Sequence, residues 1–303
     1  GSYLEGTCKT CMTLFCPCSA VEGLNRTLEF DHQRLALAVH RFAGRHAYPA
    51  FADAVFLNVE TFFAVETDAD VMLKNRRHVV WAAWVDGEVI GQRGALGRLT
   101  TGTALFQLRK PDSYFEIPWR REPGAGMLLT NLIHDLDLLR HLCGEVRSVQ
   151  AITDNSVRGF ANEDSAAVLL QFEGGALGSL TGSDAVAAPW SWELDSGENP
   201  VYPHQADQPC YLLAGTRGAL SIPQLKRWHY SEAGAGWHQP LQQVQEHFDA
   251  GEALYRQLQH FVQVVRGLVQ PLVSAADAGR TLALIEAIRL AAESGQACVP
   301  ETL

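Results

Sequence analysis

The spacing of hydrophobic residues changes near residue 98, and the chain after it reads mainly as β-strands. Short runs of alternating or β-branched residues are separated there by Gly, Asp and Pro, the pattern of half-buried strands joined by turns. Strands are predicted over residues 100–108, 146–153, 166–172, 176–182, 210–214 and 219–222. The run Phe172-Glu173-Gly174-Gly175-Ala176 is typical of a β-hairpin.

The same part of the chain also contains helical patterns. Helices are predicted over residues 127–142, 254–267 and 276–294. In the last of them, the residues expected to pack into the core are Leu282, Ile285, Ile288 and Leu290. The aromatic, turn-rich stretches 188–193 and 199–203 predict a loop that covers the sheet, forms a substrate rim or makes a subunit contact. We expect an α+β domain, with an open, largely antiparallel sheet and helices on one face.

A single histidine lies inside the leucine-rich stretch 127–142 among small polar groups. Thr130, Asn131 and Asp137 stand at i−4, i−3 and i+3 from His134, so α-helical spacing places all four on one face. One interpretation is a core histidine satisfied by these neighbours. The other is an acid/base group in a cleft, because the pKa of histidine lies near neutrality. The four residues are then expected to be either all in the cleft or all in the core.

The motif Gly-x-Gly-x-Leu-x-x-x-x-Ile-His-Asp-x-Asp over residues 124–137 resembles the catalytic-helix signature of the glucose-fructose oxidoreductase / inositol dehydrogenase (Gfo/Idh/MocA) family. Three further segments resemble the same family in the expected order: 108–121, 215–220 and the closing helix 275–298. The resemblance covers roughly the last two-thirds of the chain. Members of this family move a hydride between NAD(P) and the hydroxyl-bearing carbon of a sugar, polyol or related compound.

The resemblance implies roles for the residues of the histidine helix. His134 is expected to be the acid/base, with Asn131 and Thr130 anchoring the substrate. The family usually carries an aspartate four residues before the histidine, where Thr130 stands here, so Asn131 is expected to orient a substrate hydroxyl as donor and acceptor. Asp137 is expected to orient the imidazole through one ring nitrogen.

The same resemblance implies a substrate pocket in front of this helix. Tyr114, Trp119 and Arg120 are expected to line its wall, and Arg120 suits a carboxylate or a polyol oxygen. For each of these three residues a purely structural role is the alternative.

Residues before 98 resemble the last portion of the family's dinucleotide-binding domain. Their pattern predicts helices over 31–45, 51–68 and 81–90, a strand over 71–73 and a turn over 94–97. We expect an irregular segment over 1–30, an incomplete α/β Rossmann-like remnant of the NAD(P)-binding domain over 31–97, and the substrate and oligomerisation domain over 98–303.

Two parts of the family's cofactor site have no counterpart in the sequence. No Gly-x-Gly-x-x-Gly precedes residue 90, and Gly124-Ala125-Gly126 does not qualify because Leu129 replaces the third glycine. The family's Glu-Lys-Pro corresponds best to the run 46–49, where Pro49 is kept and Tyr48 replaces the lysine, so these two residues are the candidates for cofactor contact. We therefore expect this chain alone to bind NAD or NADP weakly or not at all.

Composition narrows the choice of partners. The formal net charge is −10, which disfavours nucleic acid because phosphate binding needs clustered Lys and Arg. No apolar run approaches the roughly 20 residues that span a bilayer, and the start does not read as a signal peptide, so a cytoplasmic location is expected.

The cysteines are unevenly spread. The first four form a Cys-x2-Cys-x4-Cys-x-Cys cluster that could hold zinc or an iron–sulfur cluster, although structural zinc sites usually use two separated pairs. The alternative is a ragged, non-native or poorly ordered N-terminus. These residues are Cys8, Cys11, Cys16 and Cys18. The isolated cysteines, expected to be buried thiols, are Cys143, Cys210 and Cys298.

Two functional hypotheses follow. The first is a Gfo/Idh/MocA-type oxidoreductase acting on a sugar-like or hydroxy-acid substrate. The second is a non-catalytic binding or assembly subunit derived from that family, or a gene model interrupted upstream. Either form is expected to be a homodimer or homotetramer, assembled through the open face of the sheet between about residues 146 and 222.

Overall fold

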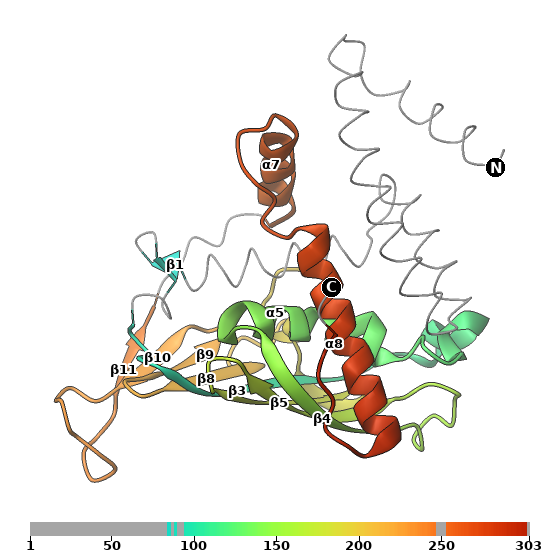
Figure 1. The fold of residues 1–303 in the computed structure, drawn as a ribbon, viewed down its shortest axis with the longest axis horizontal. Helices are drawn as coiled ribbons and strands as arrows, with labels where there is room; N and C mark the ends of the chain where they lie inside the picture. The colour runs from blue at the N-terminus through green and yellow to red at the C-terminus, as the bar shows by residue number, and fades with distance from the viewer. Residues whose placement is uncertain (1–83, 86–87, 90–93, 247–252, 302–303) are drawn as a thin grey trace.

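A computed structural model describes residues 84–85, 88–89, 94–246 and 253–301 (Figure 1). Its centre is a nine-stranded sheet in the order β11-β10-β9-β8-β3-β6-β5-β4, and β7 pairs with β3 beside this series. The strands are β3 (Leu99–Arg109), β4 (Val146–Asp154), β5 (Ser165–Phe172), β6 (Leu177–Ser183), β7 (Ala185–Trp190), β8 (Tyr211–Gly215), β9 (Ala219–Ile222), β10 (Lys226–His229) and β11 (Gln242–Gln245).

Helices cover one face of this sheet (Figure 1). Those nearest the strands are α5 (Ile133–Cys143), preceded by the π-helical turn η4 (Leu128–Leu132), and α8 (Ala275–Ser294). α7 (Ala253–Val265) stands farther from the sheet. The short helical turns are η2 (Asp112–Glu116), η3 (Pro118–Arg121) and α6 (Trp192–Asp195). No helix in the described part of the chain is long and apolar enough to cross a membrane.

One strand pair makes the sheet mixed rather than antiparallel throughout. β3 and β6 run parallel, and Thr101 to Gln107 pair in register with Leu177 to Ser183. The other pairs within the sheet are antiparallel. Parallel strands require a long crossover, and here it contains α5, β4 and β5. As a result, β3 and β6 end at the same edge of the sheet.

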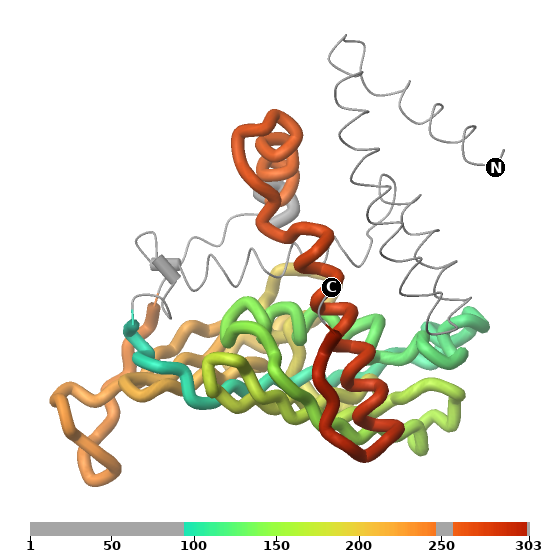
Figure 2. The backbone as a smooth tube through the Cα atoms, viewed as in Figure 1, coloured from blue at the N-terminus to red at the C-terminus, as the bar shows by residue number. Residues whose placement is uncertain are grey.

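The six strands predicted from the sequence are confirmed within one residue at each end, and so is the hairpin between β5 and β6. β7, β10 and β11 were not predicted. The stretch read as a loop over 188–193 contains the end of β7 and the start of α6. Pro189 is a signal against a strand in the sequence. The proline is tolerated because β7 pairs only with β3 in the described sheet. The chain between β10 and β11 extends outward from the sheet edge (Figure 2).

The helix predicted over 81–90 is wrong. Two short strands, β1 (Trp84–Val85) and β2 (Glu88–Val89), pair antiparallel there, with Trp84 opposite Val89. The sequence between them is Asp86-Gly87, a dipeptide that favours two-residue hairpins, and this signal outweighs the apolar run. The other elements predicted before residue 84 lie outside the described residues.

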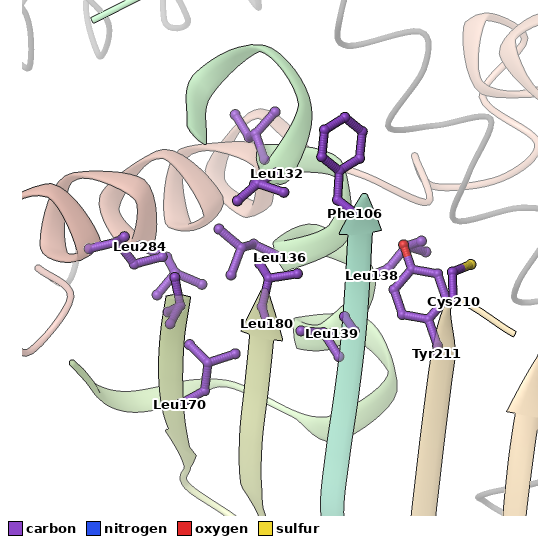
Figure 3. Packing of buried hydrophobic residues seen from close by; sticks show 14 of the residues in the cluster. Phe106, Leu132, Leu136, Leu138, Leu139, Leu170, Leu180, Cys210, Tyr211 and Leu284 are labelled. Carbon is purple, nitrogen blue, oxygen red and sulfur yellow. The ribbon is translucent and has the colours of Figure 1, made fainter. Parts of the chain in front are cut away.

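The core lies between the sheet and its helices. Leu132, Leu136 and Leu139 are fully buried above the strands that carry Phe106 and Leu180 (Figure 3). Side chains alternate along β5, where every second residue from 166 to 172 is buried. The other side chains point to the opposite face of the sheet, which no helix covers in the described part of the chain (Figure 1).

α8 buries a different stripe from the one expected. Ile285 and Ile288 are buried as predicted, and Leu282 packs at the edge of the core. Leu290, in contrast, is 40% exposed, and Leu284 is buried instead. The helical rotation explains this, because a residue two positions beyond Ile288 lies on the far side of the helix.

The isolated cysteines differ in environment. Cys210 is buried as expected, whereas Cys143 and Cys298 are only partly buried. Burial raises the pKa of the Cys143 thiol to about 12, so the thiol is protonated at neutral pH and a poor nucleophile. 

Candidate active site

The segment that carries the predicted acid/base does not begin as an α-helix. Its first turn, η4, is π-helical, and α5 starts only at Ile133. The Thr130 hydroxyl donates to the Gly126 carbonyl (3.0 Å). The carboxylate of Glu163 accepts from the Leu128 backbone N–H (2.9 Å). A π-helical turn holds more residues than an α-helical one, so the expected α-helical spacing across 130–134 is wrong.

Gly126 has a local role in this arrangement. A Cβ atom at this position would lie 2.1 Å from the Glu163 carboxylate that binds the start of the helix. The last glycine of the 124–126 pattern therefore leaves the space that the Glu163 side chain occupies. Burial raises the pKa of Glu163, and the hydrogen bond from Leu128 opposes that rise.

His134 is enclosed at the start of α5. The residue is only 8% exposed, and its Nδ1 is buried without a hydrogen-bond partner among the described residues. Burial lowers the pKa of His134 from 6.5 to about 4, so the imidazole is neutral at physiological pH. A neutral ring can accept a proton. The ring is thus largely enclosed by the protein.

Asn131 and Thr130 lie together, as the sequence suggested, but a third residue joins them. Thr130 Oγ1 lies 3.0 Å from Asn131 Oδ1, and the Lys110 ammonium donates to the same Oδ1 at 2.6 Å. Lys110 was not among the residues singled out from the sequence. A lysine at the end of an apolar strand, just before Pro111, was the available signal.

Lys110 is held by an ion pair at the shared end of β3 and β6. Its Nζ lies 3.2 Å from Asp184 Oδ2, and its backbone N–H donates to the Asp184 carbonyl (2.8 Å). The guanidinium of Arg158 bonds both sides, reaching Asp184 Oδ1 (3.0 Å) and the Lys110 carbonyl (3.1 Å). Burial lowers the pKa of Lys110, and the Asp184 carboxylate opposes this shift. Asp184 and Arg158 were also missed, because their meeting depends on the parallel strand pair.

The predicted pocket wall forms a stack of cations and aromatic rings. The Arg120 guanidinium carbon lies 3.9 Å from the centre of the Tyr114 ring, and Lys110 Nζ lies 4.7 Å from it. Arg120 Nη1 donates to the Tyr114 carbonyl (2.8 Å), while its Nε is buried without a partner among the described residues. Trp119 is 48% exposed beside them. Tyr114 therefore connects Arg120 with the Lys110–Asn131 contact.

Asp137 belongs to another part of the structure. Its residue is 1% exposed, and Oδ1 accepts from Thr281 Oγ1 on α8 (2.7 Å). The same oxygen lies 3.7 Å from Arg140, which also donates to Thr281 (2.6 Å). Asp137 thus takes part in the joint between α5 and α8. The expectation that all four polar residues share one environment is wrong, because Thr130 and Asn131 are only partly buried.

Two further buried carboxyl groups lie nearby. Burial raises the pKa of Asp135 well above its usual value, although the Tyr211 hydroxyl donates to it. Burial also raises the pKa of Glu193, whose Oε2 has no partner among the described residues. The negative charge of Glu193 raises the pKa of Asp135 further, and the positive charge of Lys110 lowers the pKa of Glu193.

Tyr48 and Pro49, and the four cysteines Cys8, Cys11, Cys16 and Cys18, lie outside the described residues. Within the described ranges, no three His, Cys, Asp or Glu side chains gather in a way that could hold a metal ion.

This fold, a mixed open sheet with helices on one face and a histidine at the start of the covering helix, agrees with a known family. Residues 89–221 match the family model described as the GFO/IDH/MocA C-terminal domain. This match covers less than half of the chain, and over these residues it confirms the resemblance to the family that was inferred from the sequence. A search of curated protein sequences found no match.

Solved structures show the same fold at low sequence identity. The WlbA dehydrogenase from Bordetella pertussis, in complex with NADH and UDP-GlcNAcA, is 22% identical with a TM-score of 0.54, covering 76% of this chain and 62% of its own. Levoglucosan dehydrogenase in complex with NADH is 16% identical with a TM-score of 0.56, covering 77% and 65%. An oxidoreductase from Agrobacterium radiobacter, in complex with NAD+, L-tartaric acid and magnesium, is 17% identical with a TM-score of 0.55, covering 89% and 77%. This chain thus spans about three-fifths of the length of the WlbA structure.

The burial of His134 predicts a pH dependence of stability. Between pH 6.5 and about 4 the unfolded chain takes up a proton on this imidazole that the folded chain does not, so stability falls as pH drops through this window. The loss amounts to about 3 kcal/mol, from the difference between the two pKa values. Above pH 6.5 the imidazole is neutral in both states and contributes no slope.

Urea unfolding of the wild type and of His134→Gln at several pH values tests this. The free energy of unfolding should fall more steeply for the wild type below pH 6.5, because the other titrating groups are common to both proteins. Parallel pH profiles would mean that the imidazole is solvated.

Proposed function

We propose that the protein is a Gfo/Idh/MocA-type NAD(P)-dependent oxidoreductase and that the described residues form its substrate half. The observation that carries this is His134, whose Nδ1 has no partner among the described residues, three positions after Asn131, whose amide oxygen accepts from the largely buried Lys110. Solved proteins of this fold bind NADH together with a nucleotide sugar acid, or NAD+ together with a hydroxy acid. We infer a sugar-like or hydroxy-acid substrate for this chain.

The residues of the site suit proton transfer at a substrate oxygen. His134 is neutral, so it takes the proton when a hydroxyl is oxidised and returns it when a carbonyl is reduced. Asn131 and Thr130 anchor the same oxygen, and Tyr114, Trp119 and Arg120 form the wall. The dinucleotide, when bound, supplies the hydride chemistry. The described residues include no glycine-rich turn between a strand and a helix that could cradle its pyrophosphate.

Removing the imidazole tests the proposed role of His134. In the full protein, His134→Ala should lower kcat/KM by about 10²–10⁴-fold, the usual contribution of a positioned acid/base, while the protein remains folded. Steady-state kinetics together with circular dichroism measure both. His238→Ala, a change on the exposed β10–β11 connection, is the matched control and should leave kcat/KM unchanged. An unfolded His134→Ala with normal activity per folded molecule would favour the structural interpretation.

Cofactor binding tests whether this chain carries the dinucleotide half of the proposed oxidoreductase as well as its substrate half. We infer that this chain alone binds NADH and NADPH weakly or not at all, because no Gly-x-Gly-x-x-Gly precedes residue 90. Titration of the purified chain, followed by nicotinamide fluorescence, measures this. A micromolar dissociation constant would contradict the inference and direct attention to Tyr48 and Pro49.

We also infer a homodimer or homotetramer assembled through the uncovered face of the sheet. Paired residues share a face, and Leu169 lies in one row with Ser179, Thr103 and Leu212. The exposed apolar residues of this face are Ile152 (75%), Leu169 (58%), Leu177 (57%) and Leu212 (46%). Such a surface favours self-association, and closed symmetric assemblies are the commonest outcome.

A charge in the middle of this face should dissociate the assembly. Light scattering at tens of micromolar should show a dimer or tetramer for the wild type and a smaller species for Leu169→Lys. Leu290→Lys makes the same change on α8, against the other face of the sheet, and should keep the wild-type mass. A monomeric wild type would contradict the proposal.

A further inference from the structure

The side-chain amide of Asn131 can lie in two orientations that differ by exchange of its oxygen and nitrogen. The oxygen accepts hydrogen bonds and the nitrogen donates them, so the orientation decides what the amide offers to a ligand. In the structure, Oδ1 faces both Lys110 Nζ (2.6 Å) and Thr130 Oγ1 (3.0 Å). Nδ2 makes no hydrogen bond within the described part of the chain.

Thr130 by itself does not select this orientation. Its hydroxyl carries one hydrogen, and the Gly126 carbonyl is an equally close acceptor for it (3.0 Å). If the amide were reversed, Nδ2 would donate to Thr130 Oγ1 while the hydroxyl donated to Gly126. Every group in that arrangement would be satisfied.

Lys110 removes this alternative. An ammonium group only donates, so a reversed amide would place the N–H donors of Asn131 against those of Lys110. The lysine cannot easily turn away, because Asp184 lies 3.2 Å from its Nζ and the ring of Tyr114 lies on another side. Arg158 in turn fixes the Asp184 carboxylate at 3.0 Å.

We propose that Lys110 is a positioning residue that locks the Asn131 amide with its N–H₂ group toward the substrate. The inference rests on the proposed function of this site. It deepens that function, because a locked N–H₂ group requires an acceptor oxygen in the ligand. Asn131 then binds a carbonyl oxygen, or the lone pair of a hydroxyl whose own hydrogen faces His134. The lock also refines the expectation that Asn131 acts as both donor and acceptor.

Magnetic resonance tests the lock without any assumption about the reaction. In protein labelled with 15N-asparagine, the Asn131 carboxamide pair is the one lost in Asn131→Asp. In Lys110→Met this pair should shift, and its proton contacts with the Thr130 side chain should strengthen as the amide reverses. Lys110→Arg should restore the wild-type position in part. Lys226→Met, the same exchange on the outlying strand β10, should leave the pair unmoved.

Kinetics of the full protein then test the consequence for the substrate. Lys110→Met should raise KM by about 10–100-fold, the value of a hydrogen bond made to a locked donor, with a smaller change in kcat. Asn131→Asp should weaken binding of the carbonyl substrate more than binding of the alcohol. A carboxylate accepts a hydrogen bond from a hydroxyl but repels a carbonyl oxygen. The double variant Lys110→Met/Asn131→Ala should be no worse than Asn131→Ala alone, because Lys110 then has no amide to position.

The two readouts fail in different ways. Identical carboxamide signals in the wild type and Lys110→Met would overturn the lock, whatever the activity. Additive losses in the double variant would overturn it as well, because Lys110 would then act independently of Asn131. A reversed amide with unchanged kinetics would support the lock but place the substrate elsewhere, and so refute the proposed function instead.

Discussion

The parallel pairing of β3 with β6 is the constraint on which the candidate site depends. It ends both strands at one edge of the sheet, so that Lys110 and Asp184 follow them side by side. Arg158 bonds the backbone or side chain of each and so closes that edge. The crossover that a parallel pair requires contains η4 and α5, so that Asn131 contacts Lys110 at the same edge and His134 follows it at the start of α5. Strand topology therefore brings together residues that are distant in the sequence.

The charges at this edge are costly to bury and so must be paired. Lys110 and Asp184 are both largely removed from water, and an ion pair in such a place adds little net stability. Removing either partner would leave the charge of the other buried without a counter-charge, so Lys110 and Asp184 hold each other in place. The His134 imidazole stays uncharged at neutral pH, because burial lowers its pKa. The site thus combines a rigid charged frame with an uncharged imidazole whose protonation burial disfavours.

Local patterns predicted much of the fold. The alternation of apolar residues in β5 and the Gly174-Gly175 turn depend on neighbours along the chain, so they were visible in the sequence. Failures occurred where a tertiary contact outweighed the local pattern. Pro189 is accepted in β7 because of its position in the sheet, and the first turn of the histidine helix is π-helical where Glu163 and Thr130 bind its backbone. A single-sequence pattern contains no trace of either contact.

The sequence by itself determined the resemblance of residues 89–221 to the GFO/IDH/MocA C-terminal domain, the positions of most strands, and the presence of His134, Asn131 and Thr130 in one segment. Only the tertiary structure decided which of these groups meet. It assigned Asp137 to the joint with α8 and brought Lys110 to Asn131, across a separation of 21 residues. The physical reason is that hydrophobic periodicity records which side of an element is buried. Pairing between polar groups is decided by strand order and helix register, which are properties of the assembled fold.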